Sequence, residues 1–383
     1  MDFDLTQEQR DFRDAVRAFA DDVIAPRAES YDRDEEFPLE VVVKMGELGL
    51  FGLPFPQGYG GLDGDFVTFC LCLEEIARVD SSVAITLEAA VGLGANPIYR
   101  FGTEEQKREW LVPMCRGQVL GAYALTEATG GSDALALRTT ARLEDGEWVL
   151  NGSKAFITNS GTPLSKVCTV AALTGEGEIS AILVPAGSPG FTVGRAYRKL
   201  GWHASDTHEL AFADCRVPEA NLLGERGRGY AELLEVLDDG RIAIAALATG
   251  LARGCLEASL AYAKEREAFG RPIGEFEAMQ FKIADMRVKI ESARLLYLRA
   301  AWLRDHGRPY KAEAAIAKLY ASEAAVDCAR DAVQVHGAYG YMEEYPVARH
   351  YRDAKVLEIG EGTSEIQRLI IARDLGLPGT NLQ

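Results

Sequence analysis

The spacing of apolar residues changes twice along the chain, and this change constrains the fold more than any other feature. The first third has helical spacing: after Thr6 and Gln9, which match a capping box, apolar residues recur every three or four positions. Similar stretches follow at 67–79, 83–99 and 103–115. A run rich in Gly and Pro precedes them and predicts a long ordered loop or a lid. We expect residues 1–118 to form an N-terminal helical domain.

Between residues 119 and 228, short runs of β-branched and aromatic residues replace the helical pattern. The dipeptides Asp145-Gly146 and Asn151-Gly152 separate such runs, and both favour the tight turns of β-hairpins. This part of the chain therefore predicts a compact middle domain of antiparallel strands.

Helical spacing returns and continues through residues 229–383. Two long apolar stripes, Met279 to Ala300 and Ala315 to His336, have members three or four residues apart. We interpret both as the core of a C-terminal helical bundle rather than as cofactor contacts, since amphipathic faces normally pack inward. The predicted fold class is mostly α with an inserted β domain.

Composition favours a soluble cytoplasmic protein. The net charge of −17 disfavours nucleic acid or an anionic membrane as the main partner. The 7 cysteines are scattered and fit reduced thiols. The acidic start, Met1 to Glu8, is unlike a leader peptide, and the apolar run from Ile242 to Leu251 is too short to span a bilayer. The histidines lack metal-ligand spacing, so no metal is expected.

The stretch that is most suggestive of chemistry places an acid, Glu361, between Gly360 and Gly362, directly before a new helix. Both glycines can adopt positive φ and let a ligand approach the backbone. Thr363 or Ser364 can cap the helix, whose N-terminus suits an anionic or carbonyl group. Glu361 is our candidate catalytic residue. Taken alone, the motif favours the alternative that Glu361 is only a first-turn acid stabilised by the helix dipole.

Two further patterns fit a ligand, and each has a structural alternative. Residues 125–133 enter a Gly-rich turn with hydroxyl side chains, which offers donors to a polar heterocycle or a phosphate. It could also be a turn that only faces solvent. Phe156 and Thr158 are two residues apart and would share one face of a strand, where a flat ring could stack. Packing in the core is the alternative there.

Together these stretches resemble the acyl-CoA dehydrogenase flavoproteins, in particular the short-chain and short-branched-chain members. The likeness covers practically the whole chain. Seven pieces in family order carry it: 125–133, 151–159, Asp238–Arg241, 266–270, Gln334–Gly337, Tyr351–Ala354 and Glu361–Glu365.

The resemblance implies a helical domain, a β-barrel-like domain and a four-helix bundle, with FAD between the last two and across a subunit contact. The isoalloxazine side would be lined by Tyr123, Leu125, Thr126, Ser132, Phe156, Ile157 and Thr158. The adenosine and pyrophosphate portion, typically of a neighbouring subunit's FAD, would meet Arg266, Phe269, Glu277, Gln334 and Gly337. Thr363 and Glu365 would complete the cofactor site, and acyl-CoA would meet Ser132, Asp238, Arg241 and Gly362.

By the same likeness, the reaction is the α,β-dehydrogenation of an acyl-CoA thioester to a trans-2-enoyl-CoA in fatty acid β-oxidation. Glu361 would abstract the α-proton, flavin N5 would take the β-hydride, and an electron-transferring flavoprotein would receive the electrons. Such a base needs a raised pKa, and burial away from water raises the pKa of a carboxyl group. Some members carry the base at the position of Gly240, where glycine cannot abstract a proton. A homotetramer, built as a dimer of dimers, is also implied.

Four positions depart from the family pattern: Ala128, Glu277 and Ala338 at expected FAD contacts, and Gly360 beside the base. An acyl-CoA oxidase or related flavin monooxygenase that uses O2 is an alternative, because oxygen access is a property of the cavity. A non-enzymatic binding scaffold is disfavoured by the net charge and by the candidate base. Acyl length stays open, since it depends on how the chain closes around the substrate.

Overall fold

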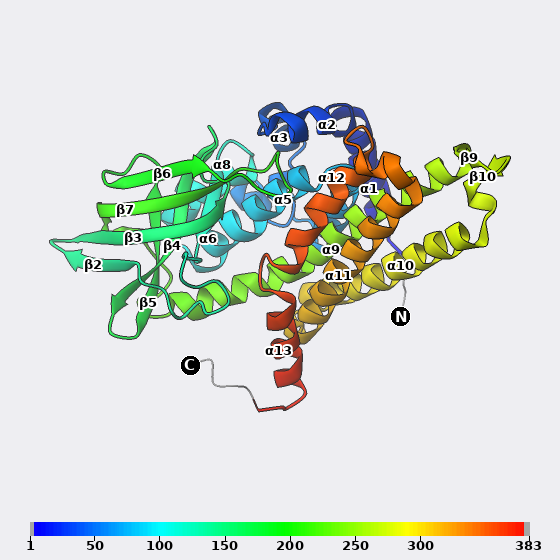
Figure 1. Ribbon diagram of the computed structural model, residues 1–383. Helices are drawn as coiled ribbons and strands as arrows, with labels where there is room; N and C mark the ends of the chain where they lie inside the picture. The colour runs from blue at the N-terminus through cyan, green and yellow to red at the C-terminus, as the bar shows by residue number, and fades with distance from the viewer. Residues whose placement is uncertain (1–3, 379–383) are drawn as a thin grey trace.

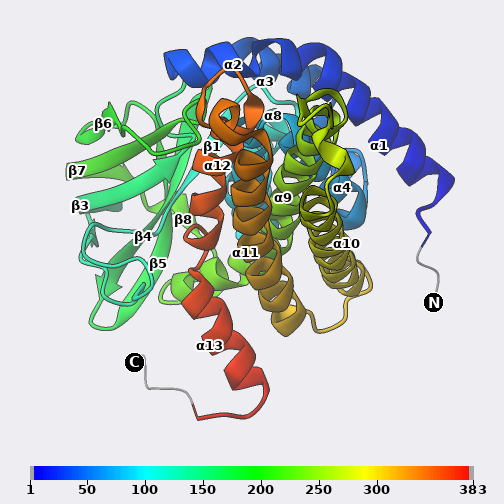
Figure 2. The same cartoon turned by 45° about the vertical axis from the view of Figure 1, so that its right-hand side comes forward.

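The computed structural model describes residues 4–378 and combines an N-terminal layer of helices, a β-sheet and a C-terminal helical bundle (Figure 1). In Figure 1 the sheet lies on the left, and the long helix α9 (Gly229–Glu265) runs from beside it into the bundle. Figure 2 shows the first helices crossing the top of both parts. Residues 1–3, on which the expectation of no leader peptide partly depends, lie outside the described range.

The elements described before the sheet are all helical, as predicted. The predicted capping box is confirmed, because Thr6 Oγ1 accepts from the Gln9 amide at 3.1 Å and Gln9 Oε1 accepts from the Thr6 amide at 3.0 Å. The Gly- and Pro-rich run is an ordered loop anchored by buried Phe51 and Phe55. The elements are α1 (Gln7–Phe19), η1 (Ala20–Ile24), α2 (Ala25–Asp34), α3 (Leu39–Glu47), η2 (Leu50–Gly52), η3 (Gln57–Tyr59), α4 (Phe66–Val79), α5 (Ser81–Glu88), η4 (Ala89–Ala95), α6 (Asn96–Phe101), α7 (Glu104–Gln106), η5 (Lys107–Leu111) and α8 (Val112–Cys115).

The middle of the chain forms one sheet with the strand order β6-β7-β3-β2-β4-β5-β8, and β1 pairs with β4. Most pairs are antiparallel, as predicted, but β1 and β2 each pair with β4 in parallel. The chain crosses other strands between these partners, and parallel pairing requires such a crossover. The elements are β1 (Leu120–Ala124), β2 (Thr140–Glu144), β3 (Glu147–Thr158), β4 (Ser165–Gly175), β5 (Glu178–Pro185), β6 (Phe191–Ala196), β7 (Thr207–Pro218), η6 (Glu219–Asn221) and β8 (Leu222–Leu223).

Only one of the two predicted hairpin turns forms. Asp145 and Gly146 both have positive φ, 52° and 83°, and join β2 to β3 as a tight turn. The prediction for Asn151-Gly152 is wrong, because both residues lie inside β3, where Gly152 has φ 146° at a register shift against β7. Glycine often marks such a bulge inside a strand.

From α9 to residue 378 the regular structure is helical apart from one small hairpin. The predicted core stripes are confirmed, since Met286, Ile290 and Tyr297 on α10 and Ser322 and Ala329 on α11 are buried. The elements after α9 are β9 (Glu267–Ala268), β10 (Arg271–Pro272), η7 (Ile273–Glu275), α10 (Glu277–Asp305), α11 (Lys311–His336), η8 (Gly337–Tyr341), α12 (Pro346–Ala354), η9 (Lys355–Glu358) and α13 (Ser364–Asp374).

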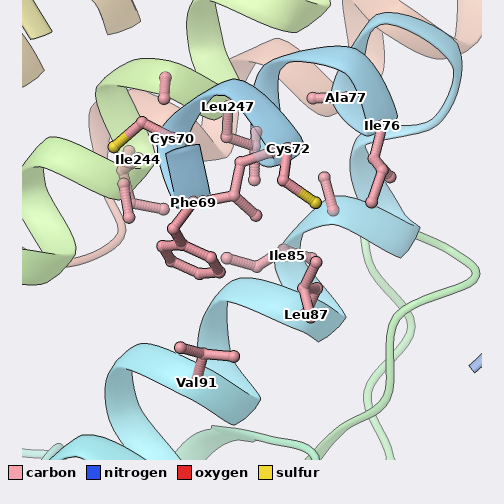
Figure 3. Packing of buried hydrophobic residues seen from close by; sticks show 14 of the residues in the cluster. Phe69, Cys70, Cys72, Ile76, Ala77, Ile85, Leu87, Val91, Ile244 and Leu247 are labelled. Atoms are coloured by element: carbon pink, nitrogen blue, oxygen red, sulfur yellow. The ribbon is translucent and has the colours of Figure 1, made fainter. Parts of the chain in front are cut away.

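A continuous apolar core joins the N-terminal helices to the bundle. Phe69 of α4, Leu87 of α5 and Leu247 of α9 pack together in Figure 3. The apolar run that looked too short to cross a membrane belongs to α9, which is long and apolar enough to do so by length and composition. However, 83% of its apolar window is buried inside the protein. The composition of α9 is therefore that of a core helix.

Candidate active site

Glu361 lies in the loop between η9 and α13, and its carboxyl group points into the protein. Both carboxylate oxygens are buried, although the residue as a whole is half-buried. A Cβ at Gly240 of α9 would overlap Glu361 Oε2 and lie 3.0 Å from Glu361 Cδ. The carboxyl group therefore occupies the space that the side chain of any other residue at position 240 would need.

The backbone that presents Glu361 differs from the expectation. Positive φ is found at Glu361 itself, 54°, and at Gly362, 99°, but not at Gly360. A left-handed conformation at a residue other than glycine is uncommon and costs free energy, so the surrounding contacts must hold it. Gln367 Nε2 and Lys318 Nζ both donate to the Gly362 carbonyl oxygen, at 2.8 and 2.7 Å. Of the two predicted caps of α13, Thr363 is the one that forms, since its hydroxyl accepts from the Ile366 amide at 3.3 Å.

A second buried carboxyl group, that of Glu88 at the end of α5, faces Glu361. Glu88 is fully buried, and a Cβ at Gly92 would lie 2.6 Å from Glu88 Oε1. Burial raises the pKa of Glu361, and burial together with the neighbouring Glu361 raises the pKa of Glu88 well above its ordinary value. The site thus holds two carboxyl groups in a space that is closed to water.

Two buried cations stand near the Glu361 carboxyl group. Burial lowers the pKa of Lys318 on α11 to about 8, and burial also lowers the pKa of Arg241 on α9. Both cations favour the ionised form of Glu361, which limits the rise of its pKa. Arg241 also forms an ion pair with Asp238, one turn earlier on α9. The Glu361 carboxyl group can therefore be both ionised and desolvated.

Tyr123 of β1 lies close to Glu361 and Arg241. Its hydroxyl donates to the Leu233 carbonyl oxygen on α9 at 3.1 Å, and burial raises its pKa. The structure thus brings together Glu361, Tyr123, Asp238 and Arg241, which the sequence placed in one site. Ser132, expected at the same place, lies in an exposed turn.

The segments expected beside a flavin ring are neighbours in the sheet region. The Thr126 carbonyl oxygen accepts from the Ala155 amide at 3.0 Å, and Lys154 Nζ donates to the Leu125 carbonyl oxygen at 3.2 Å. Phe156 has φ 62°, the residue is 63% exposed, and its ring lies beside the ring of Tyr197. Ile157 is buried in the sheet core, so only its backbone is available to a ligand, and Thr158 is half-buried.

The other expected cofactor residues lie elsewhere. Arg266 and Phe269 belong to the β9–β10 hairpin, at the opposite end of the molecule from the sheet in Figure 1. Phe269 is 96% exposed. Gln334 and Gly337 lie nearby at the end of α11, since the Arg266 guanidinium stacks over the Tyr339 ring of η8 at 5.7 Å. Within one chain, this group is separate from the site around Glu361.

The remaining two expected contacts are exposed carboxylates at helix starts. Glu277 begins α10 and Glu365 lies in the first turn of α13. Hydrogen bonds from its own backbone amide and, second, from the Thr363 hydroxyl lower the pKa of Glu365. Both positions suit the positive end of a helix dipole and leave the carboxylates in solvent.

Sequence reasoning missed Glu88 and Lys318. Glu88 is the single charged residue between Ser81 and Tyr99, and a lone acid in such an apolar run is a usable signal. Lys318 interrupts an alanine-rich stretch of α11 in the same way. Their proximity to Glu361 depends on the packing of three helices and has no local sequence signature.

Comparison with known proteins agrees with this geometry. Models of the acyl-CoA dehydrogenase N-terminal, middle and C-terminal domains match residues 6–118, 122–215 and 227–376. An acyl-CoA dehydrogenase of Bacillus subtilis is 48% identical over 380 residues, which cover 98% of this chain and 100% of the relative. The chain belongs to the acyl-CoA dehydrogenase family. The resemblance drawn from the sequence motifs is confirmed, and the enzyme is an oxidoreductase with acyl-CoA dehydrogenase activity.

Short-chain enzymes are among its relatives. The short-chain specific acyl-CoA dehydrogenase of Clostridium acetobutylicum is 45% identical over 97% of this chain and 99% of its own length. The structure of butyryl-CoA dehydrogenase from Megasphaera elsdenii superposes with a TM-score of 0.95 at 43% identity, covering 98% of this chain and 100% of that one.

Two further solved structures bear on cofactor and partner. A structure described as an electron transferring flavoprotein of Acidaminococcus fermentans has a TM-score of 0.96 at 45% identity, covering 98% of this chain and 99% of that one. A glutaryl-CoA dehydrogenase of Mycobacterium smegmatis in complex with FADH2 has a TM-score of 0.93 at 33% identity, covering 97% and 95%. The predicted fold class, mostly α with an inserted β domain, is confirmed.

Proposed function

We propose that this acyl-CoA dehydrogenase oxidises a short acyl-CoA to the trans-2-enoyl-CoA, with Glu361 as the base that removes the α-proton. The observation that carries this proposal is the buried carboxyl group of Glu361, packed against α9 where Gly240 leaves room for it. Its raised pKa gives it the basicity that the reaction requires, and its cationic neighbours allow it to ionise. The butyryl-CoA dehydrogenase relative makes a four-carbon acyl group the first substrate to test.

The proposed site residues have different roles in the reaction. The α C–H bond breaks, and its proton forms an O–H bond on Glu361. Asp238, Arg241, Ser132 and Gly362 are proposed contacts of acyl-CoA, and the cation of Arg241 suits the negative charge that develops on the thioester oxygen. The electron pair of the broken α C–H bond becomes the second bond between Cα and Cβ, while the β-hydrogen leaves with its own electron pair as hydride.

We propose FAD as the cofactor, since the residues around the site fit it. Phe156 offers an exposed aromatic plane, and the neighbouring segment at Thr126 carries hydroxyl and backbone groups that can bond a flat polar ring. Tyr123, Leu125, Ser132 and Thr158, the backbone of Ile157, and Thr363 and Glu365 would hold its redox end. When bound, FAD supplies the acceptor for the hydride.

The separate group at the far end of the chain supports a subunit contact. Arg266, Phe269, Glu277, Gln334 and Gly337 would serve the FAD of a neighbouring subunit, because they are remote from Phe156 within one chain. A cationic Arg266 and a nearly fully exposed Phe269 ring suit a dinucleotide held across an interface.

We also propose a homotetramer, and α10 offers the surface for it. Phe281, Val288, Leu295 and Trp302 are all more than 40% exposed and are spaced by seven residues. This spacing places them on one face of the helix. A continuous row of exposed apolar side chains marks a protein interface. The 7 buried free cysteines fit the proposed cytoplasmic location.

The proposed electron acceptor is an electron-transferring flavoprotein, as the similarity to the Acidaminococcus fermentans structure suggests. The proposal is tested by adding butyryl-CoA anaerobically to the purified FAD-loaded enzyme. We expect the flavin to bleach, crotonyl-CoA to form, and an electron-transferring flavoprotein to restore the colour. In air, stoichiometric peroxide during turnover would instead identify an oxidase, and a protein that cannot retain FAD would contradict the proposal.

A further inference from the structure

Glu88 is a buried acid that the proposed reaction does not yet use. It is fully buried at the end of α5, among the apolar core residues of the N-terminal domain. Acidic side chains are almost never fully buried unless they are paired. The position is therefore costly for stability and calls for a partner that offsets the cost.

The partner is the carboxyl group of Glu361. All four carboxyl oxygens of Glu88 and Glu361 are buried without a hydrogen-bond partner among the described residues, and the two carboxyl groups face each other. Two ionised carboxylates can only accept hydrogen bonds, and two like charges in a buried space repel each other. One proton between them converts the repulsion into a hydrogen bond and satisfies an oxygen on each side.

The surrounding charges decide which group carries the proton. Lys318 of α11 and Arg241 of α9 act on Glu361, and neither acts appreciably on Glu88. Asp238 of α9 forms an ion pair with Arg241. The hydroxyl of Tyr123 on β1 donates its hydrogen bond to the Leu233 carbonyl oxygen. Glu361 thus has cationic support for its negative charge, whereas Glu88 faces only the carboxylate of Glu361. The proton belongs on Glu88.

We propose that Glu88 is a positioning residue for the reaction: its protonated carboxyl group donates a hydrogen bond to the Glu361 carboxylate and keeps that carboxylate ionised and aimed. This inference rests on the proposed function, in which Glu361 is the base. When Glu361 takes the α-proton, Glu88 keeps its own proton, so the pair changes from one negative charge to none. No negative charge is then left on the two carboxyl groups beside the product.

The inference is tested by the pH dependence of flavin bleaching in a single turnover with butyryl-CoA. The variants are Glu88→Ala, which removes the donor, and Glu88→Gln, which keeps an N–H donor of similar size but cannot ionise. Loss of a hydrogen bond to the charged form raises the pKa of the base, so Glu88→Ala should shift the rising limb upward by about one pH unit or more. Glu88→Gln should restore the limb to near its wild-type position.

Glu232→Gln is the matched control, because Glu232 is also an acid with a raised pKa, although it is only partly buried, and it lies outside the site. Its limb should stay at the wild-type position. An unmoved limb in Glu88→Ala, or equal shifts in Glu88→Ala and Glu88→Gln, would overturn the inference. Glu361→Gln separates this outcome from failure of the proposed function: undiminished bleaching in that variant would remove the base itself.

Infrared spectroscopy keeps the inference testable if the alanine variant does not fold. Wild-type holoenzyme with ¹³C-labelled glutamate should show, at about pH 8, the C=O band of a protonated glutamate, where an ordinary glutamate is fully ionised. The band should disappear in Glu88→Gln. Absence of a protonated glutamate in the wild-type enzyme at this pH would overturn the assignment.

Discussion

Replacing Gly240 by alanine is predicted to disable the enzyme without unfolding it. The added Cβ would overlap Glu361 Oε2 and lie 3.0 Å from Glu361 Cδ. Nonbonded carbon atoms normally lie about 3.5–4.0 Å apart, so the carboxyl group must withdraw by roughly 1 Å. A misplacement of about 1 Å near the reacting atoms costs about 100-fold in rate. Alanine is favoured over glycine inside a helix by about 1 kcal/mol, so α9 itself is not weakened.

Stopped-flow bleaching of bound FAD by butyryl-CoA measures this effect directly. We expect a rate about 100-fold below wild type, with unchanged FAD content and melting temperature. Gly360→Ala is the matched control, because a Cβ there would meet only the Val356 carbonyl oxygen, at an ordinary 3.6 Å. A Gly240→Ala rate equal to that of Gly360→Ala would refute the packing of the base against α9.

Two other predictions concern stability and assembly. Burial lowers the pKa of His350 to about 3, so the unfolded chain binds a proton that the folded chain refuses, and stability falls as the pH drops below about 6.5. Between about pH 7 and pH 5 His350 should lower the free energy of unfolding by about 2 kcal/mol. Urea denaturation should show this decrease in the wild type and not in His350→Gln. The same dependence of unfolding free energy on pH in both proteins would contradict the prediction. Val288→Glu with Leu295→Glu should disrupt the apolar face of α10 and lower the mass measured by light scattering, whereas an unchanged mass would exclude this face as the interface.

Periodicity predicted the fold well because it records which face of each element is buried. The stripes of α10 and α11 and the turn at Asp145-Gly146 follow from residues close together in the sequence. The turn predicted at Asn151-Gly152 was wrong because this dipeptide can form either a tight turn or a bulge inside a strand. Pairing of β3 with β7 favours the bulge. The division at residues 118 and 228 into three domains stays a prediction.

The candidate site was only partly predictable, because periodicity records the buried face of each element and not the contacts between distant elements. Glu361 stands in a motif with recognisable neighbours, so the sequence pointed to it. The left-handed φ of Glu361 and the apposition of Glu88 arise from packing between α5, α9, α11 and a distant loop. No spacing along the chain encodes such contacts. A lone charge in an apolar run signals that a partner exists but does not identify it.

The central claim is that the Glu361 carboxyl group removes the α-proton. The most direct measurement is the anaerobic bleaching rate of bound FAD with butyryl-CoA in wild type, Glu361→Gln and the control Glu358→Gln, whose carboxylate is held by Lys355. Glutamine preserves size and cannot accept the proton, so Glu361→Gln should retain FAD and bleach at least about 1,000-fold more slowly, while the control bleaches normally. Bleaching of Glu361→Gln at the wild-type rate would contradict the claim.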